Sequence, residues 1–340
     1  RVGIVGIGYG QSVLVPAFRL SSVAQITALA ASTEERARAV ADRLDIPLAF
    51  GNWNALFDQV DAVAVAVPPS LQPEIVEAAL ARGLPVFCEK PLAITVGRAE
   101  RMVAAATAAG VATCVDFMFQ TIPAWVEARR LLEQGEIGPL RHIAVQWEVE
   151  TFSNQHKKSS WKTDPSQGGG TLFNFGPHVF HYLEWLFGPI LALSARLTKA
   201  PNDPRQGETL VTMAVEFKNG LTGSVSICTS AYLGQGHRLA VFGDEGSLVL
   251  HNPTNDYAKG FALWRAGRGD LALTPVAVDG SWEEWQQDGR ILATAALAGR
   301  FLEDIATRQR RAPQLADGLC VQRLLDGAER SHRTGQMIVL

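Results

Sequence analysis

Two segments of the sequence combine side chains that can move protons and polarise oxygen atoms. The first is Glu89–Pro91, which follows a short apolar run and contains Lys90. The second is Gly168–Trp185, in which three glycines precede His178. A lysine ammonium polarises an oxygen, and a neutral imidazole accepts a proton. These residue types suit acid–base chemistry on an alcohol or a carbonyl group.

A glycine turn near the start of the chain is typical of a dinucleotide site. Gly6 and Gly8 follow the first apolar run and precede a helical pattern, where Gly6 permits a tight turn and Gly8 lets the backbone approach a pyrophosphate. The next glycine is Gly10, and Gln11 stands where a third Gly or Ala is usual. Strand-to-helix punctuation without a ligand is the alternative interpretation.

The end of the second apolar run indicates which cofactor is preferred. An Asp or Glu there would bind the adenosine ribose, but this chain has Ser32 and Thr33, with Arg36 one turn later. Hydroxyl groups and a guanidinium suit a 2′-phosphate, so we expect NADP rather than NAD. The alternative for Arg36 is a solvated helix face.

The elements that must position these residues differ between the two halves of the chain. Up to about Phe119, short apolar runs alternate with helical patterns, which predicts a parallel sheet covered on both faces. The predicted strands are Val2–Val5, Ile26–Ala31, Ala62–Val67, Pro85–Cys88 and Val111–Val115. The predicted helices are 13–20, 34–44, 72–81 and 96–109.

After Phe119, strand-like stretches dominate, and Lys218–Gly220 and Asp244–Gly246 are hairpin signals. We therefore expect an α/β chain: a Rossmann dinucleotide-binding domain over residues 1–119, then an α+β domain with a large, mostly antiparallel open sheet over residues 120–340. The predicted strands of the second domain are 141–150, 192–197, 209–217, 223–228, 238–242 and 247–251. Its predicted helices are 124–133, 178–187, 291–308 and 317–332.

These motifs together resemble the glucose-fructose oxidoreductase and inositol dehydrogenase (Gfo/Idh/MocA) family of NAD(P)-dependent enzymes. The resemblance rests on the glycine turn, Ala78–Ala93 with its Glu-Lys-Pro step, Gly135–Gly138, Trp161 before the triple glycine, and the final helices. It implies an oxidoreductase that transfers hydride between a nicotinamide and a sugar, nucleotide-sugar or polyol. A dinucleotide-binding sensor and a cofactor-retaining glycosidase are the alternatives.

The resemblance also implies roles for individual residues. Lys90 and His178 take the positions of the family's catalytic lysine and histidine, and Asn174 stands where an Asp is frequent. An amide cannot accept a proton, so we expect His178 to remove the hydroxyl proton, Lys90 to polarise the same oxygen and Asn174 to orient the sugar. Pro177 is expected as the first helical residue, which would place His178 in the first turn.

The remaining expected site residues line the cofactor and the substrate. The cofactor set is Gly6, Gly8, Gly10, Ser32, Thr33, Arg36, Pro68, Glu89 and Lys90. The substrate set is His181, Trp161 and Gln120, where His181 replaces a frequent Asp and Gln120 replaces a frequent Arg of the family. Gln72 falls where a His is common. A partly buried structural role is the alternative for His181, and core packing is the alternative for Trp161.

Composition excludes several partner classes. The net charge is −3 with mixed signs, which gives no basic footprint for nucleic acid or for an anionic membrane. The four cysteines lack metal-ligand spacing, so no metal site is expected. We expect a cytoplasmic homodimer or homotetramer that binds a small sugar or polyol. Because the chain begins at Arg1 inside a strand pattern, a cleaved export signal upstream stays open.

Overall fold

The structure is a computed structural model, and it describes residues 1–280, 282 and 284–340. The chain folds into two compact units. The first comprises residues 1–118 and 290–322, and the second comprises residues 119–289 and 323–340. The division therefore starts close to the expected boundary at 119/120, but it differs from it near the C-terminus. Residues 290–322 return to the first unit because their apolar face packs there, as Phe301 does against Phe18 and Phe87.

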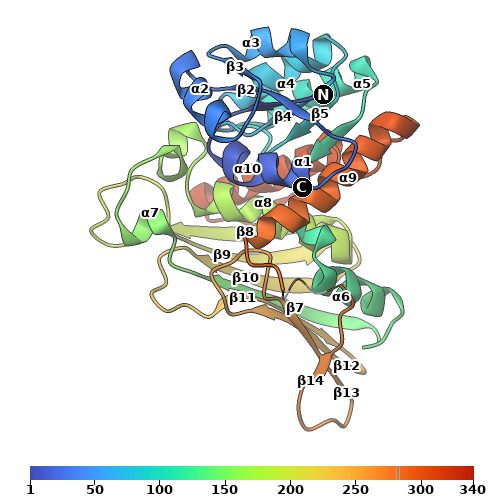
Figure 1. Ribbon diagram of the computed structural model, residues 1–340. Coiled ribbons are helices and arrows are strands. Elements are labelled where there is room, and N and C mark those ends of the chain that lie inside the picture. Colours follow the sequence, from blue (N-terminus) through green and yellow to red (C-terminus); the bar gives the residue numbers. More distant parts are fainter. Residues whose placement is uncertain (281, 283) are drawn as a thin grey trace. The chain divides into compact units, whose positions relative to one another are not determined.

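The first unit contains a six-stranded parallel sheet with the strand order β3-β2-β1-β4-β5-β6 (Figure 1). This order is that of the Rossmann fold, in which ligands bind beyond the carboxyl ends of the strands. Every residue of β1, β4 and β5 is buried, which explains their continuous apolar sequence. The strands are β1 (Val2–Val5), β2 (Ile26–Ala30), β3 (Leu48–Phe50), β4 (Ala62–Val65), β5 (Val86–Cys88) and β6 (Thr113–Val115).

Helices connect these strands, as the alternating pattern predicts. Threonine side chains cap two of them, because Thr33 accepts a hydrogen bond from the backbone at the start of α2 and Thr95 does so at α5. The helices are α1 (Val15–Arg19), α2 (Glu34–Arg43), α3 (Trp53–Leu56), α4 (Gln72–Ala81), α5 (Val96–Ala109) and α9 (Gly289–Thr307), with the short turns η1 (Gly10–Leu14), η2 (Phe57–Gln59) and η3 (Met118–Thr121).

The second unit contains a nine-stranded sheet with the order β14-β13-β12-β11-β7-β10-β9-β8-β15. All neighbouring strands are antiparallel except β7 and β10, which run parallel. Both predicted hairpins are present, joining β9 to β10 and β11 to β12. The strands are β7 (Leu140–Glu148), β8 (Ile190–Thr198), β9 (Leu210–Phe217), β10 (Thr222–Cys228), β11 (Gly236–Gly243), β12 (Gly246–Asn252), β13 (Ala262–Gly267), β14 (Thr274–Val276) and β15 (Ile338–Val339).

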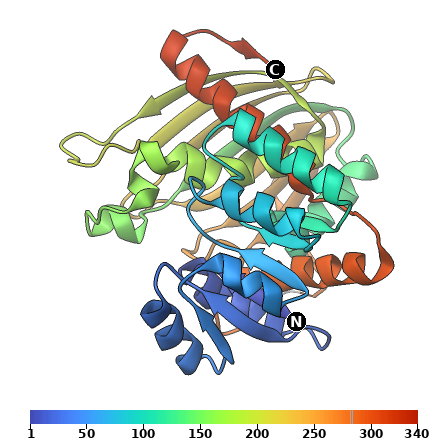
Figure 2. The same cartoon turned by 90° about the horizontal axis from the view of Figure 1, so that it is seen from above.

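Helices cover one face of this sheet. Helix α8 packs on β9 and β10, and α6 packs on β12 and β13; Figure 2 shows α8 in front of the strands. The helices are α6 (Pro123–Glu133), α7 (Phe152–Gln155), α8 (Thr171–Phe187) and α10 (Leu315–Thr334), with the turns η4 (Trp161–Thr163) and η5 (Pro165–Gln167). Helix α10 spans the boundary between the two units.

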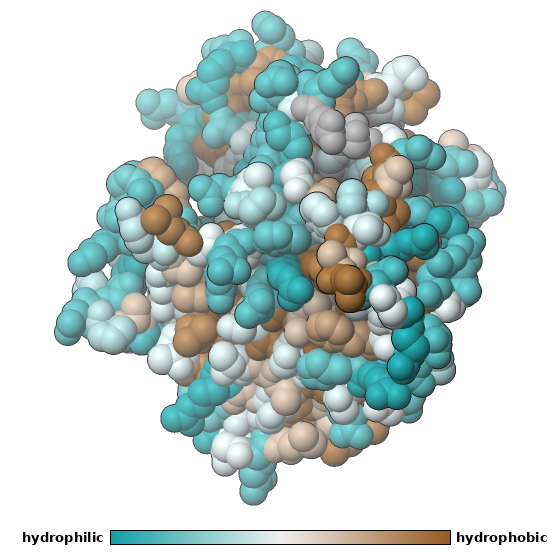
Figure 3. Space-filling model, turned by 90° about the horizontal axis from the view of Figure 1, so that it is seen from below, coloured by the Kyte–Doolittle hydropathy of each residue, from teal (hydrophilic) through white to brown (hydrophobic). Residues whose placement is uncertain are grey.

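The other face of the sheet, which none of the described helices covers, exposes small and polar side chains on β9. The apolar alternation of β9 places Val211, Met213 and Val215 on the buried side, whereas Thr212 and Ala214 are exposed. Figure 3, viewed from below, accordingly shows hydrophobic side chains interspersed with hydrophilic ones rather than gathered in one area. The uncovered side of β9 therefore carries small and polar side chains.

Candidate active site

The glycine turn after β1 has the geometry that the sequence predicts. Gly6 has a φ of +105°, and a Cβ there would overlap the carbonyl oxygen of Ala66 in the neighbouring strand connection. A Cβ on Gly8 would have none of the described atoms within 4 Å, so the backbone is open on that side. Gly10 begins the π-helical turn η1, and this wider turn accommodates the irregular spacing of the glycines before α1. The open backbone at Gly8, next to a helix start, fits a pyrophosphate.

The residues after β2 form a small hydroxyl and guanidinium group. Arg36 Nη1 donates a 2.7 Å hydrogen bond to Ser32 Oγ, and Thr33 Oγ1 accepts from the Arg36 backbone at 3.3 Å. All three residues are exposed. The arginine is therefore held over the end of β2, where an adenosine ribose lies in Rossmann folds.

The Glu89–Pro91 turn follows β5, and hydrogen bonds from one buried side-chain amide hold it in place. Gln72 is fully buried, and its Nε2 donates to the carbonyl oxygens of Glu89, Pro91 and Leu92 at 2.6, 3.0 and 3.2 Å. Pro68 starts the segment that carries Gln72, because its carbonyl accepts from the Leu71 and Gln72 backbones. Sequence reasoning treated Gln72 only as a departure from its relatives and missed this scaffolding role.

Helix α8 begins seven residues earlier than expected. It starts at Thr171, so Pro177 lies inside the helix, and the prediction of Pro177 as the first helical residue is wrong. His178 is consequently two turns from the helix start, beyond the first turn in which the helix dipole would favour a neutral imidazole. The helix retains the proline because most of its residues are buried, and their packing offsets the backbone hydrogen bond that Pro177 cannot make.

The start of α8 is built around the buried carboxylate of Glu208. Leu172 N donates to Glu208 Oε1 at 2.7 Å, and Thr171 N donates to the Glu208 carbonyl at 3.1 Å. Burial raises the pKa of Glu208 to about 7, although the Leu172 hydrogen bond opposes this shift. A Cβ on Gly170 would overlap the carboxylate, and Gly170 has a φ of +103°. The triple glycine is thus a requirement of this helix start.

Asn174 and His178 lie four residues apart on α8 and therefore share one face of the helix. The Asn174 amide donates to the carbonyls of Lys162 and Gly170 at 2.9 and 2.6 Å, which ties the loop containing Trp161 to the helix. His178 is 9% exposed, and its ring packs edge-on against Phe119 with centroids 5.2 Å apart.

The other expected substrate residues are buried. Burial lowers the pKa of His181 to about 3, so this imidazole is neutral at physiological pH. Gln120 is 6% exposed, and its Nε2 is buried without a hydrogen-bond partner among the described residues. A second histidine, His237, stacks on Trp147 at 4.0 Å and bonds Tyr182 Oη through Nε2 at 3.0 Å. No local sequence pattern indicates this cluster.

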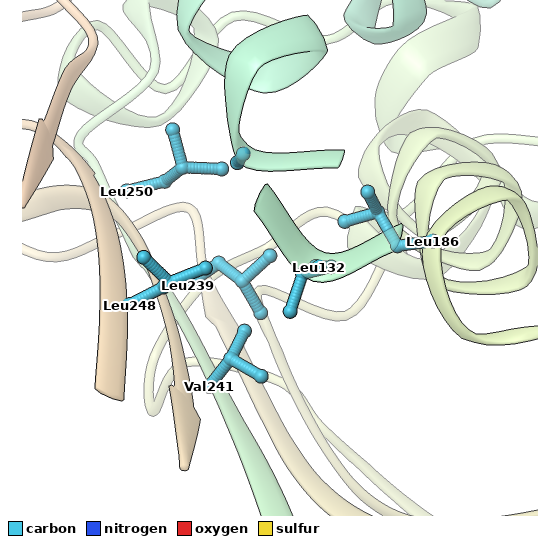
Figure 4. Close-up of a pocket in the computed structure, with 7 residues that line it drawn as sticks. Leu132, Leu186, Leu239, Val241, Leu248 and Leu250 are labelled. Atoms are coloured by element: carbon cyan, nitrogen blue, oxygen red, sulfur yellow. The ribbon is translucent and has the colours of Figure 1, made fainter. Parts of the chain in front are cut away.

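An apolar pocket in the second unit is not a candidate site. It is lined entirely by aliphatic side chains of α6, α8, β11 and β12, whose labelled members point toward one another in Figure 4. A sugar needs polar groups to orient it. Within the described residues there is no cluster of three or more potential metal ligands, and no described helix is long and apolar enough to cross a membrane.

Asp116 is a further buried acid that sequence reasoning missed. It follows β6 and is 1% exposed, and it accepts hydrogen bonds from Tyr9 Oη and Thr294 Oγ1. The structure therefore brings Tyr9, Glu89, Lys90 and Asp116 together in the first unit.

Comparisons with known proteins find a matching family model for each of the two units. Residues 1–117 match the model of an oxidoreductase family with an NAD-binding Rossmann fold, and residues 125–249 match the GFO/IDH/MocA C-terminal domain. An uncharacterized oxidoreductase of Synechocystis sp. is 30% identical and covers 98% of this chain and 94% of its own length.

Two further similar proteins are enzymes of named activity. The D-xylose 1-dehydrogenase (NADP(+)) 2 of Haloferax volcanii is 29% identical over 66% of this chain and 67% of its own length. A solved structure of levoglucosan dehydrogenase with NADH and levoglucosan has a TM-score of 0.87 and 23% identity, and covers 99% of this chain and 98% of its own. The chain thus belongs to the GFO/IDH/MocA family of oxidoreductases with an NAD-binding Rossmann fold.

Proposed function

We propose that this oxidoreductase transfers hydride between the nicotinamide of NADP and a hydroxyl or carbonyl carbon of a neutral sugar or polyol. The observation that carries the proposal is the Glu89–Pro91 turn at the carboxyl end of β5, which a buried Gln72 amide holds in place. In a Rossmann sheet this edge is where ligands bind. The named activities of the xylose and levoglucosan dehydrogenases support a sugar substrate.

The position of each residue within its own unit supports the role that the family resemblance implies. Lys90 polarises the reacting oxygen, and His178, whose ring is fixed against Phe119, removes the hydroxyl proton during oxidation. Asn174 orients the sugar from the same helix face as His178. A nicotinamide bound beside these residues would supply the hydride acceptor for oxidation and the hydride donor for reduction.

The neutral residues of the substrate set favour a neutral substrate. His181 has a pKa of about 3 and Gln120 carries no charge, so neither supplies a cation for a carboxylate or a phosphate. Both offer hydrogen bonds that suit hydroxyl groups. Trp161 provides a flat apolar surface of the kind that packs on a sugar ring.

NADP is the favoured cofactor. Arg36 and Ser32 are already hydrogen-bonded at the end of β2, and the residues directly after this strand, 31–33, include no carboxylate that could bind a 2′-hydroxyl. A guanidinium paired with hydroxyl groups suits a 2′-phosphate. We also propose that the protein acts in the cytoplasm as a homodimer or homotetramer; the small side chains of the uncovered sheet face, such as Ala214, suit a flat interface.

The first experiment measures initial rates with NAD⁺ and NADP⁺ over a panel of aldoses, anhydro sugars and polyols. With the best substrate, Lys90→Ala and His178→Ala should each lower kcat by about 100-fold or more. Asp61→Asn, an exposed carboxylate, is the matched control and should leave kcat unchanged. Full turnover in Lys90→Ala would refute the proposed role.

The cofactor preference is tested separately with Arg36→Ala. Loss of one charge-assisted contact to a phosphate should raise the Kd for NADPH about tenfold and leave the Kd for NADH unchanged. Fluorescence titration measures both. An equal loss for the two cofactors would contradict the assignment.

A further inference from the structure

The hydroxyl groups around Asp116 come from distant parts of the chain. Tyr9 Oη donates to Asp116 Oδ2 at 3.1 Å, and Thr294 Oγ1 lies 2.9 Å from the same oxygen and 3.2 Å from Oδ1. Tyr9 belongs to the glycine turn after β1, and Thr294 belongs to α9. These two donors favour the charged form of Asp116 and oppose the effect of its burial.

Glu89 is the second acid of this cluster. Cys88 and Val115 are paired in the parallel sheet, so the residues that follow them, Glu89 and Asp116, lie side by side at the carboxyl ends of β5 and β6. A hydrogen bond joins their side chains, which requires one proton between the two carboxyl groups. Burial and the neighbouring Asp116 charge raise the pKa of Glu89 well above its usual range. Burial also raises the pKa of Asp116, but the bonds from Glu89, Thr294 and Tyr9 oppose this shift. The pair therefore holds one proton and carries one negative charge.

The ammonium of Lys90 is the nearby positive charge, and its attraction favours ionisation of both acids. Two carboxylates would cost more desolvation energy than this one cation offsets, and two neutral acids would leave the cation without a counter-charge. A carboxyl pair that holds one proton carries one negative charge, which balances the single positive charge of Lys90.

We propose that Asp116 is a positioning residue for Lys90, because with Glu89 it forms a buried carboxyl pair that shares one proton and supplies one negative charge to the ammonium. This inference rests on the proposed role of Lys90 in catalysis. The charge keeps Lys90 in the ammonium form that polarises the substrate oxygen. Tyr9 links the pair to the glycine turn after β1, since its backbone lies between Gly8 and Gly10 and its hydroxyl donates a hydrogen bond to Asp116.

The other ionisable groups near the pair in the first unit do not replace this charge. Burial and the negative charge of the acids raise the pKa of Tyr9, Cys88 and Cys114, so these three groups stay neutral. Arg290 Cζ lies 5.5 Å from the ring centroid of Tyr9, and its positive charge opposes the rise in the pKa of Tyr9.

Infrared spectroscopy tests the shared proton without any substrate. At a pH above the pKa of about 7 of Glu208, the wild-type protein should show the carbonyl stretch of one buried carboxylic acid. Asp116→Asn and Glu89→Gln should each remove it, because the remaining acid then ionises against an amide. Asp61→Asn should retain it. A wild-type spectrum identical to those of both amide variants would overturn the proposal.

The pH dependence of kcat tests the effect on Lys90. Each single amide variant keeps one carboxylate, so the alkaline limb should stay within a few tenths of a pH unit of the wild-type position. The double variant Glu89→Gln/Asp116→Asn has no carboxylate, so the pKa of Lys90 falls and the limb should move down by about 1–3 pH units. A double variant with an unmoved limb, or a single variant that moves as far as the double, would overturn the proposal.

The two readouts separate this inference from the proposed function. Turnover that persists in Lys90→Ala refutes the catalytic role of Lys90. The infrared carbonyl stretch of the carboxylic acid, in contrast, reports on Glu89 and Asp116 alone. Thermal unfolding checks that each variant is folded. If Asp116→Asn does not fold, Glu89→Gln carries the infrared test, because it leaves the Tyr9 and Thr294 bonds to Asp116 in place.

Discussion

Replacement of Glu208 by Gln should remove a specific pH dependence of stability. Glu208 is the buried acid at the start of α8, where its carboxylate accepts from the Leu172 backbone. Gln keeps the shape and the acceptor oxygen but cannot titrate. The comparison of wild type with Glu208→Gln therefore isolates the ionisation of this one group.

The magnitude follows from the pKa shift. Burial raises the pKa of Glu208 from 4.5 to about 7 in the folded protein. A raised carboxyl pKa means that the contribution to stability is fully present below pH 4.5 and is lost as the pH rises through about 7. A shift of about 2.5 units corresponds to about 3 kcal/mol. The free energy of unfolding of the wild type should fall by this amount relative to Glu208→Gln.

Urea unfolding of both proteins over this pH range measures the difference. All other titrating groups are shared, so their contributions cancel. A difference that does not change with pH would refute the assignment of a buried, titrating carboxyl at the start of α8, and a difference that grows in favour of the wild type would reverse its sign.

Two further substitutions test the supports of the site. Gly170→Ala places a Cβ against the Glu208 carboxylate at positive φ and should lower the free energy of unfolding by about 2 kcal/mol or more, whereas Gly97→Ala, in an open position on α5, should be neutral or stabilising by up to about 1 kcal/mol. Equal effects of the two would contradict the crowding at Gly170. Gln72→Leu removes the donor to three carbonyl groups and should cost about 2–4 kcal/mol and lower kcat. A variant with wild-type stability in urea would show that Gln72 does not fix the Glu89–Pro91 turn.

The first unit follows its sequence closely because its signals are local. Buried parallel strands are continuous apolar runs, and the expected strands coincide with β1, β2, β4, β5 and β6 within one or two residues. The exception is β3, whose three residues, Leu48–Phe50, are too few to form a distinct pattern. The strands β13 and β14 were likewise not predicted.

The start of α8 could not be predicted from local signals. Pro177 favours a helix start, but the true start depends on Glu208, which lies more than thirty residues later in the sequence. The cluster at Asp116 has the same origin, because its partners Tyr9 and Thr294 are 107 and 178 residues away. Such groups are visible only once the chain is folded.

Transfer of deuterium tests the central claim most directly. Sugars from the panel, deuterated at each carbinol carbon in turn, are incubated with NADP⁺ and the protein, and the nicotinamide product is analysed by mass spectrometry. The proposed function predicts deuterium in NADPH from one labelled carbon with the wild type, and at least about 100-fold slower transfer with Lys90→Ala. Tight NADPH binding without transfer from any labelled sugar or polyol, or transfer at the wild-type rate in Lys90→Ala, would contradict it.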